Sequence, residues 1–508
     1  MASSIIHGKH LVKRARGDSS EVISDGAFYQ RDGTIIDVGP YQDLRSRYPG
    51  ETDIGGDSFL VIPGLVNSHH HGHGITSLQI GGLDDQLEYW MVENLGHKAV
   101  DPYLDTLYAS MKLLRSGVTT VMFNFSQRLA KGLREDCDRV LEAFGPTGQR
   151  VAFSLYLENQ YRIVAEDEGR FLSRLPSDLA ARVKAMLAEN YISDDDYLSL
   201  FQSLHQDHND GYKVNVLLSP ANVHWCSDRL LTRMRELATQ YHTGIHIHLA
   251  ESIYEKLIGL KLYGKTPLQH LKELGFLGPE VSLAHAVWLT REDLDIVGEN
   301  GLTICHNPSS NLRLKSGIAP VSTMVARGLD VAIGTDSSSI NEDEDLLQEM
   351  RLAHKLHRPP GVSSPSLDSH QILKMATVNG AKATLFEDIG ALEEGKRADA
   401  VLIRLGNLVE PYLDPDTSIV DALIYRGKAT DVDTVIIDGK VMLQGGEFVD
   451  IDEAAVMKEL SEILKRPPTD KERANQQTVQ ELMPYVTRFY ERWNLGELRP
   501  YFAYNSSV

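Results

Sequence analysis

The sequence predicts an α/β fold in which a parallel barrel is flanked at both chain ends by short antiparallel strands. Three observations predict this class. Between residues 63 and 390, short apolar segments alternate with segments of helical periodicity. Several apolar segments end in a histidine or an aspartate, which is typical of parallel strands whose ends meet at one rim. Residues 1–62 and 391–450 instead alternate apolar runs with turn residues.

Residues 1–62 and 391–450 share the same pattern of short apolar runs separated by turn residues. Residues 1–62 contain the turn pairs Asp25-Gly26 and Asp32-Gly33, and residues 391–450 contain Asp438-Gly439. Such pairs between apolar runs predict short antiparallel strands joined by tight turns. We therefore expect both ends of the chain to be rich in strands.

The central part, residues 63–390, is expected to hold the barrel. A helical pattern over Tyr103 to Arg115, for example, leads into the apolar run from Val118 to Val121. Residues 451–508 are charged and helix-prone and are interrupted at Pro467-Pro468. For this last part we expect a packing or oligomerisation role, in a chain that forms a homo-oligomer.

Composition agrees with a soluble enzyme. The 508 residues include 51 Lys+Arg against 71 Asp+Glu, and the formal charge of −20 disfavours nucleic acid or an anionic membrane as a partner. Only three cysteines occur, so no disulfide framework is expected. No signal-peptide core is visible, and no apolar run approaches the roughly 18 residues of a membrane span, so we expect a cytoplasmic protein.

The most informative segment runs from an apolar stretch directly into His69, His70 and His71. In a β-strand successive side chains alternate, so His69 and His71 point to one side and His70 to the other. Two converging imidazoles form half of a metal site. The alternative is a run of histidines on a solvated loop.

Other apolar segments end in similar side chains. His248, followed three residues later by Glu251, ends one of them, and His285, His306 and Asp336 end others. Each residue alone could be a buried core or capping residue. Together they place titratable groups on one rim, as the C-terminal face of a parallel barrel requires.

These motifs, in this order, resemble those of the amidohydrolase superfamily, in its cytosine-deaminase-like and triazine-hydrolase-like (chlorohydrolase) branch. The resemblance covers about residues 20 to 450. The matching site residues are Pro63-Gly64, His69-x-His71, His248-x-x-Glu251, His285, His306 to Asn311 and Gly334-Thr335-Asp336. Other landmarks are Asp25-Gly26, Met375 to Ala381, Gly390 to Asp399 and Asp438-Gly439-Lys440. The resemblance implies a (β/α)8 TIM-like barrel and a small β-sandwich domain built from both chain ends.

The resemblance also implies a ligand set. His69, His71, His248 and Asp336 are expected to hold one divalent metal ion, with zinc the first choice and iron the second. Such an ion lowers the pKa of water from about 16 toward 7. Binuclear relatives carry a bridging lysine at the end of the fourth barrel strand, whereas Lys213 stands at the start of its segment.

Three side chains are expected to be catalytic: Glu251, His285 and Asp336. Asp336 would ligate the metal and accept the proton of the attacking water, and Glu251 would carry a proton to the substrate. His285 would polarise or hydrogen-bond the electrophilic centre of the substrate.

The substrate contacts are weakly specified. Aromatic and amide side chains suit a planar nitrogen heterocycle or an aryl compound, although each aromatic residue is equally consistent with ordinary core packing. Adenosine-type deaminases of this branch carry a Pro-His-x-Pro motif where this chain has Pro220-Ala221-Asn222-Val223. This departure argues against recognition of an adenosylhomocysteine-like substrate. The expected contacts are Gln79, Trp90, Glu158, Asn159, His224, Trp225, His285, Trp288 and His306.

The sequence thus predicts a metal-dependent hydrolase of non-peptide C–N bonds, first of all an aminohydrolase of a nitrogen heterocycle. Hydrolysis of an amide, urea or carbamate-like bond, or of a halogenated ring, is the alternative at the same site. A non-catalytic binding scaffold is the alternative from another class. The presence of both metal ligands and the candidate proton carrier Glu251 argues against a scaffold.

Overall fold

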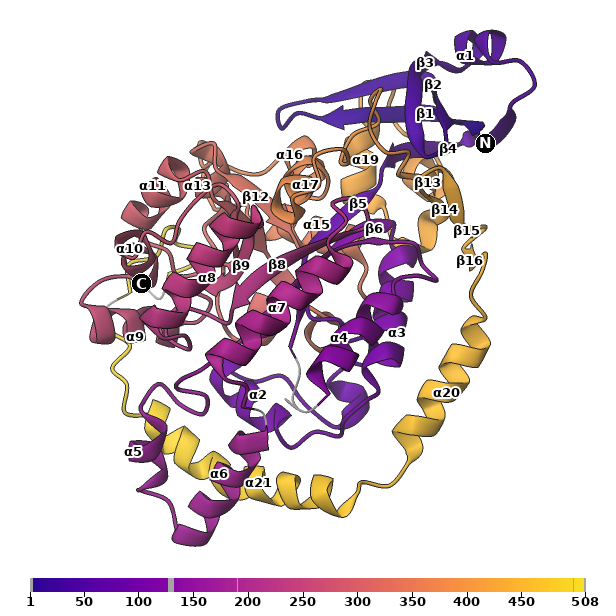
Figure 1. The fold of residues 1–508 in the computed structure, drawn as a ribbon. Helices are drawn as coiled ribbons and strands as arrows, with labels where there is room; N and C mark the ends of the chain where they lie inside the picture. Colours follow the sequence, from indigo (N-terminus) through magenta and orange to yellow (C-terminus); the bar gives the residue numbers. More distant parts are fainter. Residues whose placement is uncertain (1–2, 127–131, 190, 497, 507–508) are drawn as a thin grey trace.

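The computed structural model describes residues 3–126, 132–189, 191–496 and 498–506. Within them an eight-stranded parallel sheet, ordered β5 to β12 along the chain, curls into a barrel with helices outside it (Figure 1). The predicted α/β barrel is therefore confirmed. The strands are β5 (Leu65–His70), β6 (Val118–Phe125), β7 (Arg150–Leu157), β8 (Val214–Pro220), β9 (Ile245–Leu249), β10 (Val281–His285), β11 (Thr303–His306) and β12 (Asp330–Ile333).

The barrel closes at the C-terminal ends of its first and last strands. The backbone N–H of His71 donates to Asp336 O at 2.7 Å, and the N–H of Asp336 donates to His69 O at 2.9 Å. Gly334 allows this approach, because a Cβ at that position would lie 2.7 Å from the backbone nitrogen of His69. Closure thus brings two predicted ligand segments side by side.

Helices cover the outside of the barrel and its C-terminal rim. The first group is η1 (Leu78–Ile80), α2 (Leu87–Asn94), α3 (Pro102–Arg115), α4 (Leu133–Glu142), α5 (Glu168–Leu172), α6 (Ser177–Glu189), α7 (Asp194–His208), α8 (Asp228–Tyr241), α9 (Ile253–Tyr263) and α10 (Pro267–Glu273). The second group is α11 (Arg291–Glu299), α12 (Pro308–Arg313), α13 (Val321–Ala326), α14 (Ser338–Asn341), α15 (Leu346–Leu356), α16 (Ser369–Met375) and α17 (Val378–Thr384).

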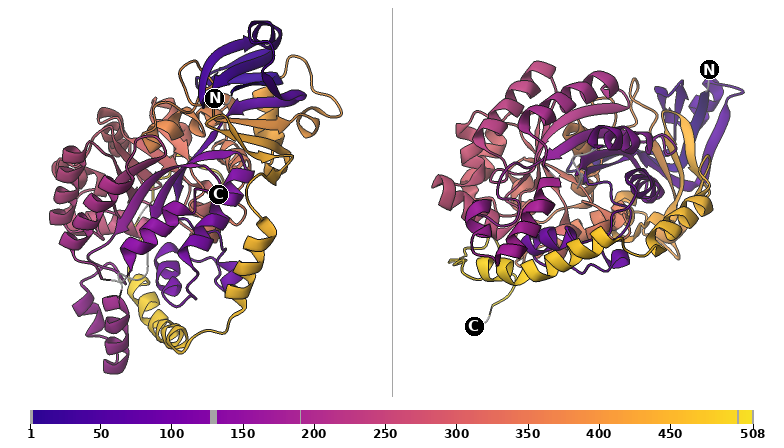
Figure 2. Two further views of the ribbon diagram at one scale, coloured as in Figure 1. Left: turned by 45° about the vertical axis from the view of Figure 1, so that its right-hand side comes forward. Right: turned by 60° about the horizontal axis from the view of Figure 1, so that its bottom comes forward.

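The two chain ends join in a second sheet beside the barrel (Figure 2). Its strand order is β16-β15-β14-β13-β4-β1-β2-β3, so strands from both ends meet where β13 pairs with β4. Its elements are β1 (Ser3–Ala15), β2 (Ser20–Arg31), β3 (Thr34–Pro40), α1 (Tyr41–Arg47), β4 (Thr52–Pro63), β13 (Ala400–Arg404), α18 (Gly406–Val409), α19 (Ile419–Arg426), η2 (Ala429–Asp431), β14 (Val432–Ile437), β15 (Lys440–Gln444) and β16 (Glu447–Phe448).

One detail of this sheet differs from the prediction of antiparallel strands. β2 and β3 are antiparallel, but β4 runs parallel to β1. The physical reason is the connection, because helix α1 separates β3 from β4 where a tight turn would have kept them adjacent.

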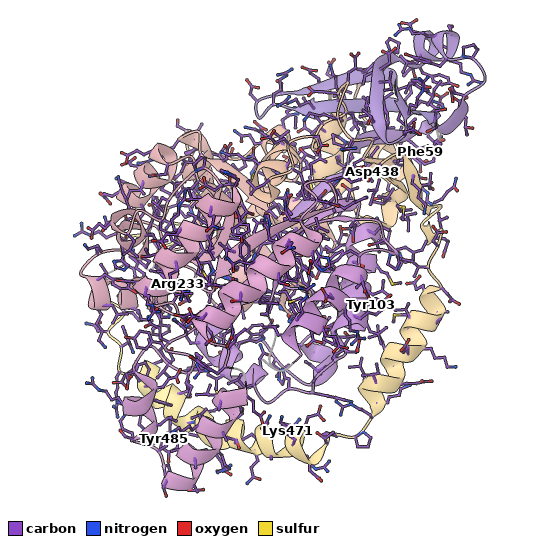
Figure 3. All side chains as sticks on the ribbon, viewed as in Figure 1. Phe59, Tyr103, Arg233, Asp438, Lys471 and Tyr485 are labelled. Carbon is purple, nitrogen blue, oxygen red and sulfur yellow. The ribbon has the colours of Figure 1, made fainter. Side chains whose placement is uncertain are left out.

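The last part of the chain forms two helices, α20 (Glu453–Lys465) and α21 (Asp470–Tyr490). They run along one side of the barrel, where Lys471 and Tyr485 mark two positions on α21 (Figure 3). Among the described residues, none of the helices combines the length and the apolar character that crossing a bilayer demands.

Candidate active site

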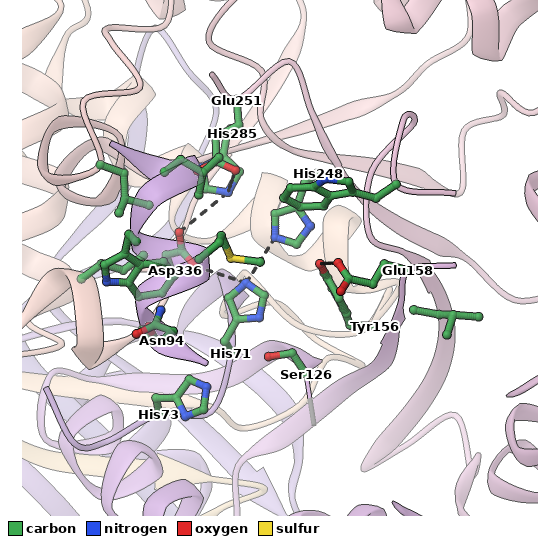
Figure 4. Close-up of a pocket in the computed structure, with 18 of the residues that line it drawn as sticks. His71, His73, Asn94, Ser126, Tyr156, Glu158, His248, Glu251, His285 and Asp336 are labelled. Atoms are coloured by element: carbon green, nitrogen blue, oxygen red, sulfur yellow. Dashed lines mark hydrogen bonds and ion pairs between the residues drawn. The ribbon is translucent and has the colours of Figure 1, made fainter. Parts of the chain in front are cut away.

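The side chains at the strand ends converge at the C-terminal face of the barrel (Figure 4). One ligand atom from each of His69, His248 and His285 lies within 4.8 Å of the others, and the same holds for His69, His71 and Asp336. His70 points elsewhere, with its Nε2 2.9 Å from Glu344 Oε1. The alternation expected for the histidine run is therefore present, and it separates His70 from the cluster.

Hydrogen bonds behind the cluster determine which nitrogen faces inward. His71 Nδ1 lies 2.8 Å from Asn124 O, and His248 Nδ1 lies 2.8 Å from Ala221 O. Because a carbonyl oxygen only accepts, both Nδ1 atoms carry the proton and both Nε2 atoms present a lone pair. These two Nε2 atoms are 3.2 Å apart. Two lone pairs facing each other at this distance repel unless a cation lies between them.

The remaining imidazoles are held in the same manner. His69 Nδ1 lies 2.7 Å from His246 Nε2, and His246 Nδ1 lies 2.7 Å from Ser282 Oγ. The buried Nε2 of His69 makes no well-aligned hydrogen bond within the described part of the chain, although Asp336 Oδ1 is 3.4 Å away. Partners of this kind orient metal-binding histidines in proteins. The residues present therefore fit a divalent metal ion.

Electrostatics supports the same assignment. Burial lowers the pKa of His71 to about 3 and the pKa of His248 well below its usual range, so both imidazoles are neutral and able to ligate. Burial opposes ionisation of Asp336, but the imidazoles of His69, His285 and His71 together hold its pKa well below the ordinary value. Neutral imidazoles with one carboxylate are a ligand set typical of zinc.

Glu251 has the opposite character. Burial, reinforced by the negative charge of Asp336, raises the pKa of Glu251 well above its ordinary value. Its Oε2 lies 3.6 Å from His285 Nε2, and its backbone N–H donates to Glu255 Oε2 at 2.8 Å. A raised pKa favours the protonated carboxyl group, the form that can donate a proton to a substrate.

A cavity of about 210 Å³ opens beside this cluster. Of the predicted contacts, Trp90, Glu158, Trp225 and His285 line it. Asn94, Ser126 and Tyr156, which are not among the predicted contacts, also line the cavity together with a set of apolar side chains. Tyr156 lies near the C-terminal end of strand β7, two residues before the predicted contact Glu158, and this position at the rim could have identified it. The apolar lining residues are Leu87, Met91, Leu95, Leu133, Leu155, Leu157, Ile192, Leu314 and Ile340.

The structure places five predicted contacts outside the cavity lining. Exposed Gln79 accepts from Thr76 N–H, and Asn159 ties two loops together through Asp194 and Ser227. These polar groups are satisfied by neighbouring chain segments.

The other three contacts are satisfied or packed in a similar way. Buried His224 packs its ring against Trp225. Trp288 donates its indole N–H to Ser316 O at 2.6 Å, and His306 Nε2 lies 2.8 Å from His357 Nε2. His224, Trp288 and His306 thus contact chain segments other than the cavity wall, and the local sequence does not predict these contacts.

Lys213, the candidate for a bridging lysine, lies away from the cluster. Its Nζ is 2.6 Å from Asp438 Oδ2 and 2.8 Å from Gly148 O, at the N-terminal end of strand β8. The described residues therefore place no lysine where a second ion would need it.

Comparison with known proteins places this site in context. The amidohydrolase family profile matches residues 60–442. A 5'-deoxyadenosine deaminase of Methanosarcina mazei is 31% identical over 445 residues, which are 86% of this chain and 92% of the relative. A 5-methylthioadenosine/S-adenosylhomocysteine deaminase of Thermodesulfovibrio yellowstonii is 32% identical over 463 residues, covering 88% and 95% of the two chains.

Solved structures agree in fold. A zinc-bound adenosine deaminase from Xanthomonas campestris superposes with a TM-score of 0.77 at 26% identity, covering 91% of this chain and 98% of that one. An atrazine chlorohydrolase from Arthrobacter aurescens superposes with a TM-score of 0.74 at 22% identity, covering 91% and 99%. At the lower identity the likeness shows the fold alone.

Proposed function

We propose that this chain, which belongs to the amidohydrolase family, is a zinc-dependent aminohydrolase that releases ammonia from a planar aminopurine, an adenine nucleoside in particular. Family membership confirms the predicted resemblance and the predicted hydrolysis of non-peptide C–N bonds. The observation that carries the proposal is the position of Glu251, whose pKa burial raises, beside the cluster of His69, His71, His248, His285 and Asp336.

In the proposed reaction His69, His71, His248 and Asp336 hold the ion. When bound, the divalent ion supplies a Lewis acid that makes a water molecule nucleophilic at neutral pH. Asp336, whose carboxylate is ionised, accepts a proton from the attacking water. Glu251 gives its proton to the ring nitrogen next to the attacked carbon, which neutralises the charge that develops there. Asp336 then passes its proton to the amino group, and the C–N bond breaks to release ammonia. The new hydroxyl group returns a proton to Glu251 as the carbonyl forms.

His285 stands between these two carboxyl groups. Its Nε2 lies 3.6 Å from Glu251 Oε2 and 3.7 Å from Asp336 Oδ2, and burial lowers its pKa to about 4. A neutral imidazole in this place can contact the substrate at the carbon that reacts. We propose this contact as its role.

The proposed substrate class rests on the cavity and on the relatives. Trp90 and Trp225 offer flat apolar faces to a planar ring, and Glu158 adds one acidic group to the wall. The relatives that are 31% and 32% identical are named as deaminases of adenine nucleosides. A single ion is proposed because Lys213 lies away from the cluster. Self-assembly into a homo-oligomer stays a prediction.

The test is ammonia release from purified, zinc-supplemented protein across a panel of aminopurine nucleosides, free purines, pterins, cytosine, chlorinated triazines and arylureas. We expect ammonia from the aminopurine nucleosides and loss of that activity after chelation. Release of chloride or of an amine, with no ammonia from any nucleoside, would replace this proposal by the ring-dehalogenase or urea-hydrolase alternative.

A further inference from the structure

Helix α2 forms one wall of the cavity and is covered on its other side by α21. Trp90, Met91 and Asn94 of α2 line the cavity. Val92 of α2 belongs to an apolar cluster with Tyr490 and other residues of α21. Because neighbouring helix residues point in different directions, α2 contacts the cavity with one face and α21 with another. The C-terminal helix thus packs behind a wall of the active site.

Tyr490, in the last turn of α21, contacts two elements at once. It is 4% exposed, and its ring centroid lies 6.1 Å from that of Tyr89 on α2 and 4.8 Å from that of Tyr254 on α9. Helix α9 begins at Ile253, two residues after Glu251. One buried side chain therefore packs on both the cavity wall and the helix that follows the candidate proton donor.

These two elements are also joined directly. Ser252 Oγ donates to Glu88 Oε1 of α2 and accepts from the backbone N–H of Glu255 at 3.2 Å. Glu255 Oε2 in turn accepts from the backbone N–H of Glu251 at 2.8 Å. A shift of α2 relative to α9 would therefore act on the backbone of Glu251.

The C-terminal extension is anchored well enough to transmit such an effect. Lys98 Nζ donates to the carbonyl oxygens of Ile463, Leu464 and Arg466 at 2.7 to 2.8 Å, which fixes the end of α20. Further along, Lys471 of α21 lies 2.7 Å from Glu189. The matched family region ends at residue 442, so this support lies outside it.

We propose that Tyr490 is a positioning residue that holds α2 against α9 and so fixes both the cavity wall at Trp90 and the backbone of Glu251. The kinetic part of this proposal rests on the proposed function, whereas the packing part does not. The neighbouring Phe489 provides the matched control. Its ring contacts Phe171 of α5 and Tyr490 itself, with centroids 6.3 and 5.0 Å apart, but within the described chain it contacts no aromatic ring of α2 or α9.

The test compares Tyr490→Ala, Tyr490→Phe and Phe489→Ala in the full-length protein by amide hydrogen exchange. Tyr490→Ala should raise exchange in α2 and in the first turn of α9, whereas Phe489→Ala should raise it in α5. Tyr490→Phe, which keeps the ring, should match the wild type. If Tyr490→Ala does not fold, Tyr490→Leu should give the same pattern to a smaller extent.

Kinetics supply the second readout. Misplacement of site groups by a distant change can cost up to about 10²-fold, so we expect kcat/KM of Tyr490→Ala to fall by at least about tenfold, with both kcat and KM changed. Phe489→Ala should leave KM within about twofold.

Two results would overturn the proposal: unchanged exchange in α2 and α9, or equal kinetic losses in Tyr490→Ala and Phe489→Ala. If the wild type released ammonia from no nucleoside, the proposed function would fail, and the exchange pattern would still decide the role of Tyr490.

Discussion

Residues that surround the histidine and aspartate cluster orient its side chains through hydrogen bonds. The backbone carbonyl oxygens of Asn124 and Ala221 accept hydrogen bonds from Nδ1 of His71 and His248. Each imidazole therefore presents its Nε2 toward the cluster. Ser310 Oγ donates to Asp336 Oδ2 at 2.6 Å and so fixes one carboxylate oxygen. The inward atoms are thereby oriented before any ion binds, which reduces the entropy lost on binding.

Replacement of Glu251 tests the proton donor. Glu251→Gln keeps the shape of the side chain but removes the acidic proton, so kcat should fall by at least about 10²-fold. The zinc content should not change, because Glu251 is not part of the proposed ligand set. Both are measured on the same preparation, by steady-state kinetics and elemental analysis.

The control for this variant is Glu349→Gln, a second buried carboxyl group that accepts from Ser309 N–H at 2.8 Å and does not line the cavity. Its kcat should stay close to that of the wild type. Loss of zinc together with activity in Glu251→Gln would show that Glu251 is a ligand.

Glu158 makes stability depend on pH. Burial raises its pKa to about 7, with Tyr156 OH donating to Oε2 at 3.0 Å. Because the folded-state pKa lies above the unfolded value, this group's contribution to stability is present below about pH 4.5 and is lost as pH rises through about 7. Glu158→Gln has no carboxyl group to ionise and so avoids this loss of stability. The Tm of the variant minus the Tm of the wild type should therefore increase as pH rises from about 4.5 to about 7. A Tm difference independent of pH would contradict the assignment.

At the scale of elements, the strand ends could be predicted from the sequence. Apolar runs ending in His71, His248, His285 and Asp336 are local signals, and parallel strands bring their C-terminal ends to one rim whatever the loops do. The closure of β12 onto β5 then follows from the barrel itself. For this reason the structure brings together His69, His71, His248, His285 and Asp336, whereas His306, at the end of β11, contacts His357 instead.

The cavity wall could not be predicted in the same way. Trp90 and Trp288 are alike in sequence terms, yet only Trp90 lines the cavity, because α21 packs behind α2 while Ser316 O binds the indole of Trp288. The side chain of Gln79 likewise accepts a hydrogen bond from Thr76 N–H within its own turn. Which loop side chain reaches the cavity depends on contacts between segments far apart in sequence.

The two tryptophans give a matched test of the wall. The indole Nε1 of Trp90 is buried without a hydrogen-bond partner among the described residues. Trp90→Ala should raise KM at least about tenfold through loss of substrate contact. Trp288→Ala should lower Tm and leave KM near the wild-type value. Equal KM changes in the two variants would show that the wall has been wrongly assigned.

At the scale of the whole molecule, the barrel and the second sheet are joined by buried charge. Arg150 of β7 is fully buried and pairs with Asp399 and Asp438 next to strands of the second sheet. This contact lies at the start of β7, while the proposed metal ligands lie at the C-terminal ends of the strands. The buried pairs of Arg150 and the candidate active site therefore lie at opposite ends of the barrel strands.

Removal of Arg150 should be costly. Arg150→Met leaves the buried carboxylate of Asp399 without its main partner, whereas the half-buried Asp438 keeps Lys213, and we expect a loss of about 3–5 kcal/mol in the free energy of unfolding. Lys440→Met, which breaks the exposed pair with Asp450, should cost no more than about 1 kcal/mol. Chemical denaturation measures both. Equal costs would mean that the buried cluster does not join the two sheets.

The central claim is that one divalent ion, held by His69, His71, His248 and Asp336, enables this chain to deaminate an aminopurine nucleoside. The most direct measurement is a zinc titration of chelator-treated protein, with bound metal and ammonia release followed together. We expect bound zinc and ammonia release to rise in parallel and to saturate near one equivalent of zinc per chain. Full ammonia release from metal-free protein, or saturation of both signals near two equivalents, would contradict it.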